Sequence, residues 1–77
     1  MIVLVVGKGS ISKRYTEILQ SKKIVFFNIS TKSINRFFKN NLSFLDSSCN
    51  KIIICNKTYD HIKTLKKINN FEFKGNI

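Results

Sequence analysis

The sequence contains no proline, no tryptophan and only two cysteines among its 77 residues. Two cysteines cannot form a framework of several disulfide bridges, which excludes a small secreted domain stapled in that way. The opening apolar run, Met1 to Val6, is too short for a membrane span or for the apolar core of a signal peptide, and no basic stretch precedes it. We therefore expect a soluble, cytoplasmic protein of one domain, residues 1–77, with no membrane partner.

Acidic residues are also scarce. Four Asp and Glu stand against 14 Lys and Arg, and the formal net charge is +10. This charge favours anionic partners such as nucleotides, nucleic acid, acidic lipids or acidic proteins. The only adjacent lysine pairs are Lys22-Lys23 and Lys66-Lys67. Because the lysines are otherwise scattered, a generally solvated basic surface is the alternative to a dedicated anion-binding face.

Short apolar runs alternate with segments of helical periodicity. The run Ile2 to Val6 is typical of a strand buried on both faces, and Ile24 to Phe27 is a second run of the buried-strand type. Ile52 to Cys55 is expected to form a third strand. Strands that alternate with helices predict an α/β fold, specifically a Rossmann-like three-layer sandwich with a mainly parallel sheet and right-handed crossovers. The apolar positions of the expected helices are Ile11, Tyr15, Ile18 and Leu19, then Ile34, Phe37 and Phe38, then Ile62, Leu65 and Ile68.

Several local features are expected within this frame. The pattern of Leu42 to Asn50 is ambiguous, with Leu42 to Phe44 as a candidate short edge strand. Phe71 to Ile77 is a candidate for the beginning of a last strand. Thr58 is expected to cap the helix after the third run. Lys22 and Lys23 are expected in the last turn of the first helix, where cations suit the helix dipole.

The glycine-rich segment Gly7-Lys8-Gly9-Ser10-Ile11-Ser12 follows a buried strand and opens a helix, which is the context that a dinucleotide-binding loop requires. Gly7 permits the tight turn, and Gly9 lets a pyrophosphate approach the backbone. The free N–H groups and the dipole at the helix start then favour the phosphates. Ser12 occupies the third motif position, which usually holds Gly or Ala. An ordinary glycine turn is the alternative.

The end of the second strand carries no acid. In NAD-type sites an acid binds the adenosine ribose hydroxyls about 20 residues past the loop. Here the segment Asn28 to Ser33 supplies Ser30, Thr31 and Lys32, which suit a 2′-phosphate, so NADP is preferred over NAD as the cofactor. The alternative is that these residues only begin the second helix, with Ser30 or Thr31 as its cap.

Two segments resemble the NAD(P)-binding domain of the glucose-fructose oxidoreductase / inositol dehydrogenase (Gfo/Idh/MocA) family. Ile2 to Tyr15 is similar to the family's strand, G-x-G-S-I-G, basic pair and His. The second segment follows Ile52 to Cys55 and is similar to the family's T-P-x-x-x-H. In it Asn56, Lys57 and His61 take the Thr, Pro and His places. The resemblance implies that these three residues contact the cofactor on its nicotinamide side, whereas a surface histidine is the alternative for His61.

The resemblance also implies missing parts. Family members carry an E-K-P motif with a catalytic lysine on the strand that Phe73 to Ile77 would begin, and then a larger substrate domain. The chain therefore looks truncated, isolated from a longer protein, or completed by another polypeptide. We expect a dinucleotide-binding module derived from an oxidoreductase, with no catalytic residue and no dehydrogenase activity of its own.

Two other functions stay open. A small basic nucleic-acid-binding protein is supported by charge alone and is not favoured. A self-associating subunit, most simply a homodimer that exchanges Phe71 to Ile77, is supported by strands that a truncated sheet leaves uncovered. Cys49 and Cys55 do not show a metal-binding spacing, and Cys55 is interpreted as core packing.

Overall fold

A computed structural model describes all residues from Met1 to Ile77. Its single sheet has three parallel strands, β1 (Ile2–Val6), β2 (Val25–Ile29) and β3 (Lys51–Ile54). The strand order is β2-β1-β3, so the continuous apolar run of β1 lies at the centre, paired on both sides. The predicted α/β class with a parallel sheet is confirmed.

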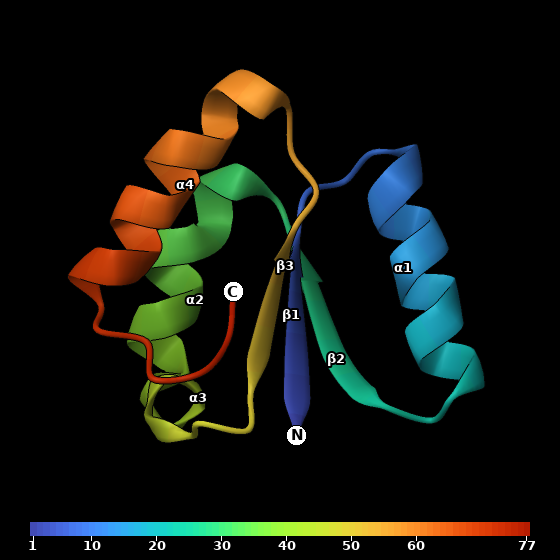
Figure 1. Cartoon of the computed structure of the whole chain (residues 1–77), viewed down its shortest axis with the longest axis horizontal. Helices are drawn as coiled ribbons and strands as arrows, with labels where there is room; N and C mark the ends of the chain where they lie inside the picture. The colour runs from blue at the N-terminus through green and yellow to red at the C-terminus, as the bar shows by residue number, and fades with distance from the viewer.

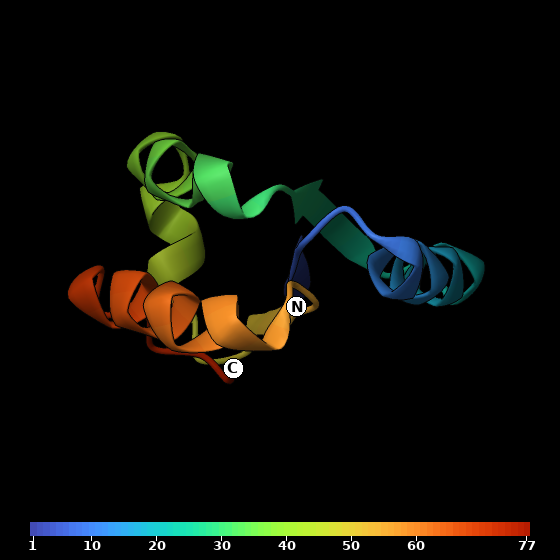
Figure 2. The same cartoon turned by 90° about the horizontal axis from the view of Figure 1, so that it is seen from above.

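Helices cover both faces of the sheet, which gives the three layers visible in Figures 1 and 2. The helix α1 (Ser10–Ser21) lies alone on one face. The crossover from β2 to β3 runs back past β1, and a right-handed crossover in that direction must use the opposite face. That face carries α2, α3 and α4, and the short 3-10 helix η1 precedes them. Their bounds are Thr31–Ser33 for η1, Ile34–Asn40 for α2, Leu42–Asp46 for α3 and Thr58–Asn70 for α4.

The two faces of the sheet bury unequal cores. Side chains on alternate positions of a strand point to opposite faces, so Leu4 and Val6 join the larger core while Val3 and Val5 join the smaller one. Phe37 contacts the rings of Phe38 and Phe44 within the larger core edge-on, and it contacts the exposed Phe27 in the same way. The other members of the larger core are Ile34, Leu45, Ile52 and Ile68.

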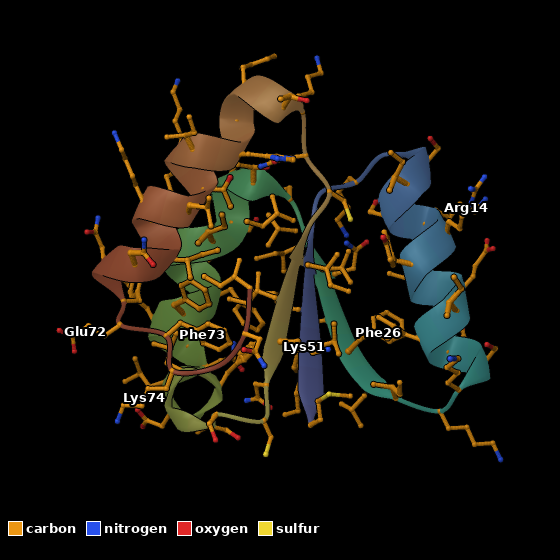
Figure 3. All side chains as sticks on the ribbon, in the orientation of Figure 1. Arg14, Phe26, Lys51, Glu72, Phe73 and Lys74 are labelled. Atoms are coloured by element: carbon orange, nitrogen blue, oxygen red, sulfur yellow. The ribbon has the colours of Figure 1, made fainter.

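The prediction that the apolar stripe of α1 is buried is wrong for most of its residues. Of that stripe only Leu19 is buried, and Ile11, Tyr15 and Ile18 are exposed. The other buried residue of α1 is Ser12, which is only 1% exposed. Because α1 has no neighbouring helix on its face, only the narrow strip that touches the sheet is covered. Figure 3 shows Phe26 pointing from β2 toward this strip.

Two strand expectations are also wrong. β2 is an edge strand rather than a strand buried on both faces, and Val25 and Phe27 are exposed. Leu42 to Phe44 belongs to the helix α3. There the adjacent residues Phe44 and Leu45 are both buried, and a strand would direct adjacent side chains to opposite faces.

The expected helix ends shift by one or two residues. The N-cap of α4 is Lys57 rather than Thr58, and no side chain caps it. The last turn of α1 contains no basic residue, because Lys22 is already the C-cap. Lys23, with φ of 57°, is in the left-handed region and cannot continue the helix.

The segment Phe71 to Ile77 does not form a strand. A single parallel bridge joins Asn76 to Lys51 of β3, and Phe71 and Phe73 pack against the larger core. Figure 3 labels Phe73 and Lys51. The buried Asn50 anchors this segment, since its backbone oxygen accepts from Asn76 N. The Asn50 side chain also accepts from Ile2 N and donates to the Phe44 oxygen.

Candidate functional site

An open cleft lies where the three parallel strands end. In Figure 1 the loops after β1, β2 and β3 meet at the top of the sheet. The strand order reverses at β1, and ligands of open α/β sheets bind at such a switch point, outside the carboxyl ends of the strands. The volume of the cleft is about 530 Å³. Its lining residues are Gly7, Lys8, Gly9, Ser30, Thr31, Lys32, Cys55, Asn56, Lys57, Tyr59 and Asp60.

Three segments selected separately from the sequence thus line one cleft. They are Gly7 to Gly9, Ser30 to Lys32, and Asn56 with Lys57. Ser10 and Ile11 line a second, smaller hollow of about 320 Å³, which shares Gly9, Cys55, Asn56 and Lys57 with the cleft. His61 does not line the cleft. Its Nε2 lies 2.8 Å from the backbone oxygen of Asn56, so it contacts the backbone of the loop after β3.

The two loop glycines differ in what surrounds them. Gly7 has φ of +130°, and a Cβ there would lie 3.0 Å from the backbone carbon of Cys55. The fold itself therefore requires glycine at this position. A Cβ at Gly9 would meet nothing within 4 Å. Gly9 leaves free space at the mouth of the cleft, and no neighbour in the fold explains the missing side chain.

That free space adjoins the start of α1. Gly9 is the N-cap, and the first helical hydrogen bond runs from Lys13 N to the Gly9 oxygen. The preceding N–H groups, from Ser10 to Ser12, have no partner within the helix and carry the positive end of its dipole. The first turn contains no acid to offset that charge. Ser12 Oγ donates to the Gly9 oxygen at 2.7 Å, so serine fits the third motif position.

Each of the three loops brings one lysine to the cleft. These are Lys8, Lys32 and Lys57, and the only lining acid is Asp60. The lining residues therefore carry a net positive charge, which raises the local concentration of anions. Lys57 Nζ lies 6.0 Å from the centroid of the Tyr59 ring.

Asn56 connects the loop after β3 to two other elements. Its Nδ2 donates to Thr31 Oγ1 at 3.1 Å and to the buried Thr64 Oγ1 at 2.6 Å. Its Oδ1 is buried and has no hydrogen-bond partner. The side chain thus holds η1 and α4 together behind the cleft. Sequence reasoning selected Asn56 but missed Thr64, because a lone threonine in a helix carries no recognisable signal.

Sequence reasoning also missed Cys55, Tyr59 and Asp60 as lining residues. They flank the predicted Asn56 and Lys57, so the position of that loop was the available signal. Burial raises the pKa of the Cys55 thiol above its ordinary value, and the group stays a thiol rather than a reactive thiolate. No group of three or more His, Cys, Asp or Glu side chains is arranged to hold a metal ion. None of the helices has the length and apolar character needed to cross a membrane.

Comparisons of the chain with protein-family models, with curated proteins and with solved structures give no match. The resemblance to the Gfo/Idh/MocA family therefore stays a prediction from two sequence segments. The order of the strands can be compared with the two common arrangements of parallel α/β sheets. An order of 2-1-3 is the beginning of the flavodoxin-like arrangement, and the Rossmann order places a further strand beside β2.

Proposed function

We propose that the cleft binds the adenosine and phosphate part of a dinucleotide, NADP in preference to NAD. The observation that carries this proposal is the free space at Gly9, between the start of α1 and the lysines of the cleft. A phosphate in that space could accept hydrogen bonds from the first N–H groups of α1. Lys57 would add attraction from the neighbouring loop after β3.

The preference for NADP follows from the end of β2. No carboxylate is present from Asn28 to Ser33, so the usual acceptor for the ribose hydroxyls of NAD is missing. Ser30, Thr31 and Lys32 instead bring two hydroxyls and an ammonium to the cleft. The two hydroxyls can donate hydrogen bonds to a phosphate, and the ammonium adds positive potential.

The sheet has only the three strands β2, β1 and β3. A complete Rossmann domain combines two nucleotide-binding halves across the switch point and has a larger sheet. We therefore propose weak binding of a whole dinucleotide, concentrated on its adenosine half. The role is that of a cofactor-binding module derived from an oxidoreductase, and a substrate pocket is not part of the proposal.

Titration calorimetry at low salt tests this proposal with NADP and NAD as ligands. The wild-type chain should bind NADP measurably at millimolar concentrations and bind NAD more weakly. Gly9→Val should abolish binding without loss of the fold, because the new side chain would occupy the phosphate space and meets no protein atom at its Cβ. Ile62→Ser, on the exposed surface of α4, is the control and should bind like the wild type.

Three results would contradict the proposal. Failure of both dinucleotides to bind at millimolar concentration removes the function. A clear preference for NAD removes the choice of cofactor. Binding by Gly9→Val as strong as that of the wild type places the ligand elsewhere.

A further inference from the structure

The side chain of Lys8 does not extend freely from its loop. Its Nζ lies 2.9 Å from the backbone oxygen of Asn28 and 3.3 Å from Asn28 Oδ1. Asn28 is 20 residues further along the chain and is the penultimate residue of β2. The loop after β1 thus places its ammonium group at the carboxyl end of β2. In an NAD-type site, that end of the strand carries the acid that binds the ribose.

We infer that Lys8 is the residue that recognises the 2′-phosphate of the adenosine ribose. This inference rests on the proposed function and makes it specific. Both present acceptors of Lys8 are neutral amide oxygens, so these contacts supply no counter-charge. A 2′-phosphate would supply that charge, whereas a 2′-hydroxyl would not.

Asn28 acts as a positioning residue for this lysine. Its Nδ2 donates to the Val5 oxygen at 3.0 Å and to the Gly7 oxygen at 2.8 Å. Because the amide nitrogen donates to these two carbonyl oxygens, the amide oxygen Oδ1 faces Lys8. A carboxylate at position 28 could donate to neither carbonyl and would bring its charge close to both oxygens. The backbone of the loop therefore explains why an amide stands here in place of an acid.

Lys32 and Lys57 have a different role in the same cleft. They line it from the loops after β2 and β3, but no hydrogen bond fixes their ammonium groups. They supply a general positive potential that acts on every phosphate of a ligand. Only Lys8 is held at the end of β2, so only its removal should act on one phosphate selectively.

The test compares two ligands that differ by the 2′-phosphate alone, adenosine 2′,5′-bisphosphate and adenosine 5′-monophosphate. Calorimetry with the wild-type chain should give tighter binding of the bisphosphate. Lys8→Met should reduce the ratio of the two affinities by about 10- to 100-fold, as expected for loss of a charged hydrogen bond. Lys8→Arg keeps a cation and should retain most of the ratio.

Two matched variants serve as controls for charge. Lys32→Met should weaken the binding of both ligands by similar factors and leave the ratio of their affinities unchanged. Lys66→Met removes the same charge from the exposed surface of α4 and should change neither affinity at moderate salt. Circular dichroism spectra verify that each variant is folded.

The outcomes separate the inference from the function on which it rests. If the wild-type chain binds neither ligand, the proposed function and the inference both fail. If it binds both ligands equally, nucleotide binding stands and the role of Lys8 is rejected. If Lys8→Met retains the wild-type ratio while Lys32→Met loses it, Lys32 is the recognising residue and the inference is wrong.

Discussion

At the scale of single residues, the three glycines of the chain have different reasons to be glycine. A Cβ at Gly7 would press on the Cys55 backbone, and a Cβ at Gly75 would collide with the Asn50 oxygen. Packing therefore requires glycine at both of these positions. Gly9 alone has open space around it, which separates a glycine kept for the fold from one that leaves room for a ligand.

The pair Gly7→Ala and Gly9→Ala tests this distinction. Gly7→Ala should destabilise the chain by about 1–3 kcal/mol, because φ of +130° is strained for alanine and the Cβ has no room. For a domain of this size that loss lowers the Tm by roughly 4–8 °C for each kcal/mol. The free energy of unfolding of Gly9→Ala should lie within about 0.5 kcal/mol of the wild-type value. Equal melting temperatures of the two variants, measured by circular dichroism, would show that the loop is not held as described.

At the scale of elements, periodicity predicted α1, α2 and α4 but not α3, and it did not predict which side of α1 is covered. Ile11, Tyr15, Ile18 and Leu19 recur at helical spacing, yet Leu19 is 7% exposed and Ile18 is 45% exposed. The physical reason is the small contact area of a helix that lies alone on one face of a sheet. Figure 3 shows Arg14 on the side of α1 away from the sheet.

Alanine substitutions at two neighbouring positions test which side of α1 faces the sheet. Leu19→Ala should cost about 2–4 kcal/mol in the free energy of unfolding, because it empties part of the smaller core. Ile18→Ala should cost less than about 1 kcal/mol, because nearly half of that side chain is already in water. Chemical denaturation of both variants gives the comparison, and a larger loss for Ile18→Ala would mean that α1 is rotated about its axis.

At the scale of the whole molecule, the sheet has two unequal edges. The edge of β3 is bridged once by Asn76. The outer edge of β2 is open, and the strand Val25–Ile29 contains no charged residue and no proline that would discourage pairing. Phe71 to Ile77, the segment expected to be exchanged in a dimer, packs against its own chain. We therefore place the proposed self-association at β2, where two copies could pair about a two-fold axis.

Sedimentation at several salt concentrations tests self-association. The net charge of +10 opposes association of two copies, and salt screens that repulsion. The dimer should therefore strengthen as salt rises, whereas binding to nucleic acid would weaken. Val25→Lys, which places a charge on the open edge, should shift the population toward monomer. A folded monomer at every salt concentration and at high protein concentration would rule the dimer out.

The candidate site could be predicted largely because its residues follow strands. Runs of β-branched residues mark buried strands, and in a parallel sheet the loops after them share one edge. Thr64, which supports Asn56 from α4, gave no such signal. Neither did the contact of Lys8 with Asn28, since it depends on which strand lies beside β1.

By itself, the sequence determined the α/β class, the three strands and the glycine loop, because runs, periodicity and turn residues act over a few neighbouring positions. Only the tertiary structure decided that β1 is central, that Leu42–Asp46 is a helix and that Phe71 to Ile77 folds back on its own core. These outcomes depend on contacts between residues far apart in the chain. Such contacts depend on how the other elements pack, and a pattern of a few neighbouring residues does not determine that packing.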